Sequence, residues 1–394
     1  MADAALDLDY ERILQDARER TGLADFGDAV FREPLRRLLQ GLEEEAELNA
    51  LGRAIQRERI LGFLVTHLQF EAYWQRHPEI AREVVAEPVV IIGLGRTGTT
   101  MLQRLLAANP RFYSTLWWEA RFPVPFPGEP VENPSQRIAR ARAEVAQMYE
   151  TIPDLEAIHP VDAMQADEEI LLLEQSFYSS TPEAFAKLPR FAAWLDRQDQ
   201  TPGYAYLKRL LQFLQWQKRL RGVTGERWIL KSPHHIHYTD VLLAVFPDAR
   251  IVQTHRDPVY VIPSWVSLNY SLWQQGSDSA DPLEAGRHWN EKMATGMQRC
   301  MRVRDAGHAQ RFLDLDYREI AERPLAAVER VYDFIGWEFT REAREATQAW
   351  LRENGREKRP PHNYTLEMFG LSEAGLREKY REYIERFIEP RAGA

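Results

Sequence analysis

The residues of this chain best suited to chemistry lie in a glycine-rich segment that follows a short β-branched run. Val89–Ile92 reads Val-Val-Ile-Ile, which is typical of a buried parallel strand. Gly93, Gly95 and Gly98 follow at once, and apolar residues at helical spacing begin near Leu102. A strand, a glycine turn and a helix together point backbone N–H groups and a helix N-terminus at an anion. The segment therefore predicts a site for a phosphate-like group.

The spacing of this segment fits the nucleotide-binding P-loop except at one position. Gly93, Gly98 and Thr100 match the pattern, but Thr99 stands where the P-loop lysine belongs. Because that lysine serves the β- and γ-phosphates, its absence disfavours an enzyme that splits a nucleoside triphosphate. We expect a smaller anion, held by loop amides and by side chains. The side chains expected to hold it are those of Arg96, Thr97, Thr99 and Thr100.

The elements that must position this loop alternate between strands and helices. Further strands are expected at Trp228–Leu230, Arg250–Gln253 and Phe312–Leu315, with helical stretches between them. Such alternation predicts a P-loop-like three-layer α/β/α fold with a central, mainly parallel sheet. Ligands of such sheets bind at the carboxyl ends of the strands. The polar motifs that begin at Lys231 and His255 follow directly at those predicted ends.

Composition limits the class of protein. The 394 residues are 44% hydrophobic and 28% charged, an ordinary balance for a protein with a full core, and the net charge of −9 argues against a general nucleic-acid binder. Cys300 is the single cysteine, which excludes an intrachain disulfide and a zinc site made of thiolates. No stretch approaches the roughly 20 apolar residues of a membrane span. The acidic N-terminus does not read as a signal peptide, so we expect a cytoplasmic protein.

The predicted organisation has two parts. Residues 1–85 read as amphipathic helices without a catalytic pattern, and we expect a helical layer or a subunit contact there, for instance in a homodimer. Residues 86–394 form the α/β domain. Helical insertions that line the acceptor site are expected at about 120–225, and a helical segment is expected at the C-terminus.

Three motifs in this order resemble those of a known family. They are the loop of residues 93–100, Lys231-Ser232-Pro233-His234, and His255-Arg256-Asp257-Pro258. Over residues 87–370 the chain resembles sulfotransferases that use 3′-phosphoadenosine 5′-phosphosulfate, in particular the bacterial branch related to tyrosylprotein sulfotransferases. The resemblance implies metal-independent, in-line transfer of a sulfuryl group to a hydroxyl of a small-molecule, lipid or sugar acceptor. It also implies that Arg96, Thr97, Gly98, Thr99 and Thr100 bind the 5′-phosphosulfate, and that Arg256 and Ser264 bind the 3′-phosphate.

The spacing of Arg256 and Ser264 agrees with that implication. Asp257-Pro258 reads as the start of a helix, with proline pre-set for the first turn. Eight residues make about two helical turns, so Ser264 can share a face with groups near that N-terminus. A guanidinium fork and a hydroxyl suit a dianionic phosphate.

The resemblance leaves two candidates for the general base. Tyrosylprotein enzymes imply Glu119 as the base, Lys231 and Arg96 as the cations that neutralise developing charge, and Arg121 as an orienting group. Small-molecule enzymes use a histidine shortly after the lysine, which points to His234 instead. We favour Glu119, and both assignments stay open at this stage.

Other residues are expected at the edges of the site. Asp167-Glu168-Glu169 reads either as acids that favour a helix start or, with His159, as part of the acceptor site. In the related enzymes a tyrosine after the last strand contacts adenine, which implies Tyr317. Lys358 and Arg359 either reach the 3′-phosphate or form a solvated charge run.

Four aromatic residues after the loop are compatible with an apolar or amphipathic acceptor, and equally with a core. They are Trp117, Trp118, Phe122 and Phe126.

Two alternatives to a sulfotransferase remain: an ATP- and magnesium-dependent kinase or nucleotide phosphatase, and an inactive nucleotide-binding relative. Thr99 argues against the former, and the retained Arg96, Lys231, Arg256 and Ser264 argue against the latter.

Overall fold

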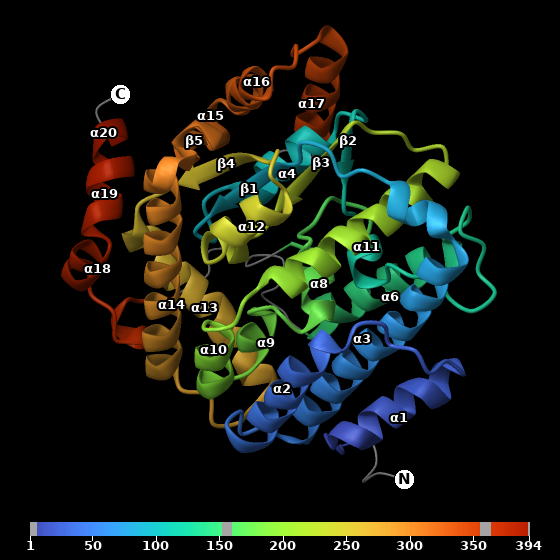
Figure 1. Ribbon diagram of the computed structural model, residues 1–394. Helices are drawn as coiled ribbons and strands as arrows, with labels where there is room; N and C mark the ends of the chain where they lie inside the picture. The colour runs from blue at the N-terminus through green and yellow to red at the C-terminus, as the bar shows by residue number, and fades with distance from the viewer. Residues whose placement is uncertain (1–5, 152–159, 355–363, 393–394) are drawn as a thin grey trace.

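The computed structural model describes residues 6–151, 160–354 and 364–392, which surround a parallel sheet of five strands (Figure 1). The strands are β1 (Val89–Gly93), β2 (Phe112–Ser114), β3 (Arg227–Lys231), β4 (Arg250–His255) and β5 (Phe312–Asp316). Their order is β2-β3-β1-β4-β5, and every neighbouring pair is parallel. The four predicted strands are confirmed to within two residues. The three-residue β2 is too short to give a readable pattern.

Both faces of the sheet are covered, because side chains of β1 alternate between two hydrophobic clusters. Val90 and Ile92 lie in one cluster, whereas Val89 and Ile91 lie in the other. All four are fully buried, as expected for a central strand with helices on each side. The expected three-layer α/β/α architecture is therefore confirmed.

The two helical layers come from different parts of the chain. The first cluster includes residues of α11 (Thr201–Leu220), α12 (Thr239–Val245), α13 (Pro258–Gly276) and α14 (Pro282–Val303). The second includes residues of α4 (Thr99–Ala107), α15 (Tyr317–Glu322), α16 (Pro324–Phe334) and α17 (Arg341–Glu353). The helices that follow β1, β3, β4 and β5 thus pack back onto the sheet and leave the carboxyl edge of these strands to the loops.

The N-terminal helices form a layer beside the insertion that precedes β3, in the lower part of Figure 1. They are α1 (Tyr10–Thr21), α2 (Arg32–Glu44) and α3 (Ala50–Arg76). Their apolar faces share one core with Phe177, Leu188 and Phe191 of the insertion. Glu71 of α3 accepts two hydrogen bonds from Arg209 of α11, at 2.8 and 2.9 Å. Residues 6–85 are helical as predicted, but their core is built jointly with the insertion.

The insertion and the C-terminal segment are also helical. The insertion carries α5 (Trp117–Arg121), α6 (Ser135–Thr151), α8 (Ile170–Leu173), α9 (Thr181–Phe185) and α10 (Pro189–Leu195) before α11. The C-terminal helices are α18 (Glu373–Lys379), α19 (Arg381–Phe387) and α20 (Glu389–Ala392). Tyr383 and Phe387 of α19 contact His255 at the end of β4, so the last helices close the core near that strand.

Candidate active site

The glycine-rich loop after β1 has the backbone of an anion cradle. Gly98 is left-handed, with φ of 85°, and caps the start of α4. Arg96 is also left-handed, with φ of 69°, which is uncommon for a residue with a Cβ and is found at functional loops. A Cβ on Gly95 would lie 2.2 Å from Cε3 of Trp265, so glycine is required where α13 meets the loop. The loop therefore has the strand, glycine turn and helix start that the sequence predicts.

One of the predicted anion-binding hydroxyls is used inside the protein. Thr97 is fully buried, and its Oγ1 donates to the carbonyl of Leu94 at 2.7 Å and lies 2.6 Å from Oγ1 of Thr254 in β4. These bonds fasten the loop to the neighbouring strand. We therefore correct the sequence-based expectation: the Thr97 side chain shapes the loop, and only its backbone N–H remains for a ligand.

The loop meets the beginning of α13, as the spacing of the motifs predicts. Asp257 caps α13 by accepting a hydrogen bond from the N–H of Val259 at 2.9 Å. Nε of Arg96 donates to Oγ of Ser264 at 3.2 Å, and Nη1 of Arg256 donates to the carbonyl of Arg96 at 3.1 Å. The three residues expected to hold the two anions of one donor therefore lie together.

An aromatic ring completes this side of the site. The guanidinium carbon of Arg256 lies 4.1 Å from the centre of the Tyr317 ring at the start of α15. A Cβ on Gly98 would lie 3.3 Å from the same ring. Tyr317 thus flanks both the loop and Arg256, at the place where the resemblance implies adenine contact.

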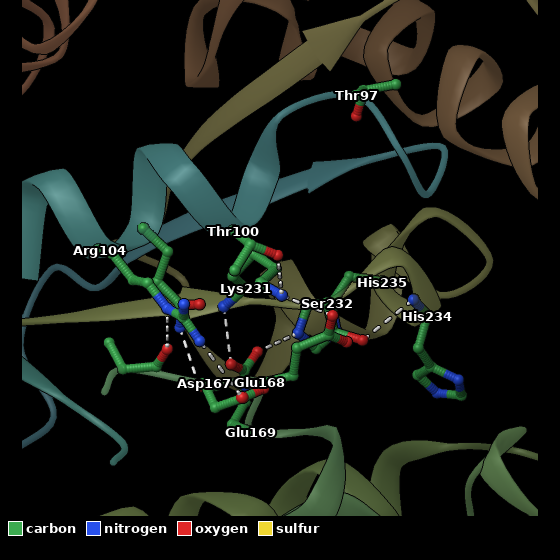
Figure 2. A network of polar contacts seen from close by, with 12 residues as sticks. Thr97, Thr100, Arg104, Asp167, Glu168, Glu169, Lys231, Ser232, His234 and His235 are labelled. Atoms are coloured by element: carbon green, nitrogen blue, oxygen red, sulfur yellow. Dashed lines mark hydrogen bonds and ion pairs between the residues drawn. The ribbon is translucent and has the colours of Figure 1, made fainter. Parts of the chain in front are cut away.

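The lysine at the end of β3 is buried and forms a short ion pair. Nζ of Lys231 lies 2.5 Å from Oε1 of Glu168 and donates to Oγ1 of Thr100 at 3.2 Å (Figure 2). The Lys231 side chain is fully buried, whereas that of Glu168 is 18% exposed. Burial raises the pKa of Glu168, and the adjacent ammonium of Lys231 opposes that rise. A cation and a carboxylate therefore stand together beside the anion loop.

The rest of the acidic triplet is also part of this cluster. The carbonyl of Asp167 accepts a hydrogen bond from Nε2 of Gln103 at 2.9 Å, and its carboxylate lies 3.9 Å from Arg104. Oε2 of Glu169 accepts the backbone N–H of Lys231 at 2.7 Å. The contacts with α4 and β3 favour the interpretation of residues 167–169 as site residues over that of simple helix-start acids.

Glu119 is a structural residue rather than an accessible base. Its carboxylate is fully buried, with Oε2 at 2.6 Å from Nζ of Lys218 and Oε1 at 2.7 Å from Nη2 of Arg221. Oε2 also accepts the N–H of Leu116 at 3.0 Å. In the described part of the chain, no hydrogen bond or ion pair joins Glu119 to the loop or to Lys231. The structure therefore argues against our assignment of Glu119, because both oxygens are already neutralised by α11.

The neighbours of Glu119 that were assigned to the acceptor site lie in the same structural cluster. Arg121 pairs with Glu144 of α6 at 2.7 Å. Trp118 is 2% exposed, and the guanidinium groups of Arg137 and Arg221 lie 5.1 and 5.3 Å from its ring. These contacts correct both assignments, since the side chains pack against α6 and α11.

The second candidate base, His234, lies close by but is buried. It is 2% exposed, its Nδ1 lies 2.9 Å from Oγ of Ser180, and its Nε2 has no hydrogen-bond partner among the described residues. Burial, together with nearby positive charge, lowers its pKa well below 6.5. In Figure 2 its ring points away from Lys231 and Glu168. His234 is thus a weak base without an open path to the loop.

Three of the predicted site residues lie outside the part of the chain that the structure describes. His159, Lys358 and Arg359 fall in the undescribed segments 152–159 and 355–363.

Among described residues, no cluster of three or more His, Cys, Asp or Glu side chains is placed to hold a metal ion. None of the described helices combines the length and apolar character needed to cross a membrane.

A P-loop-like parallel sheet with this loop and two flanking basic motifs defines a class of nucleotide-dependent group-transfer proteins. The model of the sulfotransferase family matches residues 88–341, so the chain belongs to the sulfotransferase family. Omega-hydroxy-beta-dihydromenaquinone-9 sulfotransferase Stf3 of Mycobacterium bovis is 26% identical over 265 residues. That alignment spans 65% of this chain and 65% of the relative, and Stf3 of Mycobacterium tuberculosis matches equally.

Two solved structures resemble the chain over nearly its whole length. Sulfotransferase STF1 of Mycobacterium tuberculosis H37Rv is 30% identical, with a TM-score of 0.82, over 94% of this chain and 98% of that chain. Sulfotransferase STF9 of Mycobacterium avium is 27% identical, with a TM-score of 0.86, over 96% of each chain. The similarity includes the helical regions on both sides of the family match.

Proposed function

We propose that this protein is a sulfotransferase that moves a sulfuryl group from 3′-phosphoadenosine 5′-phosphosulfate to a hydroxyl of a small-molecule or lipid acceptor. The single observation that carries the proposal is the meeting of Arg96 in the loop with Arg256 and Ser264 of the following motif. The donor carries two separated anions, a 5′-phosphosulfate and a 3′-phosphate. Two basic segments at one edge of the sheet fit such a molecule.

The residues present fit the parts of this donor. Gly98 gives the loop its left-handed turn at the start of α4, and Thr100 stands at the first turn of that helix. The phosphosulfate would be held by the loop amides with Arg96, Thr99 and Thr100. The 3′-phosphate would be held by Arg256 and Ser264, and the purine would contact the ring of Tyr317.

The chemistry requires one base and one cation beside the loop. The acceptor oxygen attacks sulfur, and the bond from sulfur to the phosphate oxygen breaks. The electron pair leaves with adenosine 3′,5′-bisphosphate, and the hydroxyl proton goes to a base. Glu168 is that base in this proposal, because it is partly exposed and lies beside the loop. Lys231, 2.5 Å from Glu168, stabilises the charge that develops on the transferred group.

The acceptor is proposed from the relatives. Stf3 is named for transfer to an omega-hydroxylated menaquinone. We propose an amphipathic alcohol of comparable kind for this chain, with the reaction located in the cytoplasm and run without a metal ion. The aromatic residues that we considered for acceptor binding do not support this choice, because Trp117 and Trp118 are buried in a core cluster with α6.

Calorimetry tests the proposal against its kinase alternative. We expect adenosine 3′,5′-bisphosphate to bind tightly with or without magnesium, and ATP with magnesium to bind more weakly. Arg256→Ala should weaken bisphosphate binding at least about tenfold, since a charge-assisted contact to phosphate is lost. Arg250→Ala, at the opposite end of β4, is the matched control and should bind as the parent does. A preference for ATP with magnesium would overturn the proposal.

A transfer assay then identifies the acceptor. Purified protein, labelled donor and a set of primary alcohols of graded chain length, together with hydroxylated quinones, should give labelled sulfate esters. Turnover that rises with the apolar length of the alcohol supports an amphipathic acceptor. Equal turnover of short, fully polar sugars and of long alcohols contradicts that part of the proposal.

A further inference from the structure

A buried chain of polar side chains runs behind the ion pair of Glu168 and Lys231. Oε1 of Glu169 lies 2.6 Å from Nε2 of His235, and Nδ1 of His235 lies 2.7 Å from the hydroxyl of Tyr204 in α11. Glu169, His235 and Tyr204 are each fully buried. Figure 2 shows Glu169 and His235 beside Lys231.

The positions of the protons in this chain follow from its chemistry. Burial raises the pKa of the Tyr204 hydroxyl well above 10, and the negative charge of Glu169 adds to the rise. Tyr204 therefore keeps its proton and donates it to Nδ1 of His235. The ring proton of His235 then sits on Nε2 and is donated to Glu169. The result is a continuous hydrogen-bonded chain from Tyr204 through His235 to Glu169.

The second carboxylate oxygen of Glu169 contacts the end of β3, the strand that carries Lys231. Oε2 accepts the backbone N–H of Lys231 at 2.7 Å, so both oxygens of the Glu169 carboxylate have a hydrogen-bond partner. The hydrogen bond from the Lys231 N–H fixes the backbone of the residue that carries the ammonium. The hydrogen bond with His235 fixes the turn that follows β3. Glu169 thus joins the turn to the end of β3, and His235 links this point to Tyr204 of α11.

We propose that Glu169, oriented by His235 and Tyr204, is a positioning residue for sulfuryl transfer that holds Lys231 in place and keeps a fixed negative charge beside Glu168. This inference rests on the proposed function, because it assigns a task to residues behind the base and the cation. A fixed negative neighbour favours the protonated form of Glu168 and so makes Glu168 a better proton acceptor.

The charges around Glu168 lie on its own segment, on β3, on the turn after β3 and on α4. Asp167 and Glu169 on its own segment and Lys231 from β3 act on it directly. His235 from the turn after β3 pairs with Glu169, and Arg104 from α4 lies near Asp167. Burial raises the pKa of Glu168, Lys231 lowers it, and Asp167 and Glu169 raise it again. If Glu169 loses its negative charge, it no longer raises the pKa of Glu168, whereas Lys231 still lowers that pKa. Glu168 would then give up its proton at lower pH.

The test is a pH profile of kcat/KM for Glu169→Gln. We expect the acid limb to move to lower pH by about half a unit, since a like charge next to the base is removed. We also expect kcat to fall about tenfold, because a weaker base and a looser Lys231 both slow transfer. Affinity for adenosine 3′,5′-bisphosphate should stay within about twofold of the parent, since Glu169 does not contact the donor.

A second variant protects the test against misfolding. Tyr204→Phe keeps the ring but removes the proton that fixes the His235 tautomer. It should lower kcat several-fold and leave bisphosphate affinity unchanged. If Glu169→Gln does not fold, a Tyr204→Phe protein with the kcat of the parent overturns the inference by itself.

The matched control is another buried carboxylate that pairs with a histidine and a lysine. Glu183 is fully buried and lies 2.7 Å from Nζ of Lys292 and 3.0 Å from Nε2 of His288. Glu183→Gln should lose stability without moving the acid limb. An unmoved limb in Glu169→Gln, or an equal shift in Glu183→Gln, overturns the inference. Failure of the parent to bind the bisphosphate would instead overturn the proposed function.

Discussion

At the scale of single residues, Glu119 and Glu168 differ in what occupies their carboxylate oxygens. The carboxylate of Glu119 is held by Lys218, Arg221 and a backbone N–H, and its side chain is 1% exposed. The carboxylate of Glu168 has one cationic partner, Lys231, and the Glu168 side chain is 18% exposed. A base must be reached by the acceptor hydroxyl, so the second arrangement suits proton transfer and the first suits a structural role.

Glu168→Gln should therefore separate binding from chemistry. The amide keeps the shape of the side chain but cannot take a proton, so we expect kcat to fall at least about 100-fold. Affinity for adenosine 3′,5′-bisphosphate should be retained or raised, because Lys231 loses the partner that holds its charge. Single-turnover rates and calorimetry on the same preparation check both parts. A variant with the parent's turnover would show that the base lies elsewhere.

Glu119→Gln should affect stability instead. Removing one partner of a buried ion pair leaves charge uncompensated, at a cost of about 3–5 kcal/mol. Lys218 and Arg221 would be the uncompensated groups here. Denaturant unfolding should show this loss, while kcat per folded molecule stays within a few-fold of the parent at low temperature. A stable Glu119→Gln protein without turnover would restore Glu119 as the base.

At the scale of elements, the approach of α13 to the glycine loop sets the geometry of the donor site. Gly95→Ala would place a methyl group 2.2 Å from Cε3 of Trp265, so the loop or the indole must move. We expect bisphosphate affinity to fall at least about tenfold, since the loop amides must keep their directions to hold an anion. Calorimetry measures the loss, and unchanged affinity would contradict this account of the loop.

Gly62→Ala is the matched control for that variant. Nothing lies within 4 Å of a Cβ at Gly62 in the middle of α3. The added methyl group should stabilise the helix by about 0.5–1 kcal/mol, because alanine has the higher helix propensity. Donor affinity should not change.

The sequence predicts elements better than it predicts the partners of charged side chains. The β-branched run at β1, the Asp257-Pro258 helix start and the glycine loop are local patterns, and each is found where it was expected. The roles of the glutamates depend on distant residues instead. Lys218 and Arg221 lie about a hundred residues from Glu119, and no spacing rule links them. The available signal for Glu168 was three adjacent acids with no basic residue nearby in sequence.

Tyr204, Thr254 and Trp265 could not be found from the sequence for the same reason. Each is an ordinary residue in a helix or a strand, without a motif around it. Their contacts arise because α11, β4 and α13 converge on β3 and the loop. Only the topology of the sheet brings these elements together.

At the scale of the whole molecule, buried neutral histidines couple stability to pH. His67 packs between the N-terminal helices and α11, where its ring stacks on Tyr206 with centroids 4.6 Å apart. Burial lowers its pKa to about 4. His237 lies against Gly296 of α14, and burial lowers its pKa to about 3. The folded protein keeps both rings neutral at a pH where an unfolded chain protonates them.

The direction of the effect follows from these shifts. Both folded pKa values lie below the ordinary value of 6.5, so the unfolded state binds more protons as pH falls. The stability that the two neutral rings contribute is fully present above pH 6.5. As pH falls, the contribution of His67 is lost down to about pH 4 and that of His237 down to about pH 3. At pH 4 the combined loss is on the order of 6 kcal/mol, which is comparable with the 5–15 kcal/mol that stabilises a typical protein.

We therefore expect acid unfolding that begins at mildly acidic pH, before most carboxylates are protonated. Denaturant unfolding at pH 7.5 and pH 5 should show a drop in the free energy of unfolding, with about 2 kcal/mol of it due to each histidine. His237→Gln cannot take up a proton, so its drop between the two pH values should be smaller than the parent's by that amount. An equal drop in the two proteins would mean that His237 does not contribute to the acid stability of this fold.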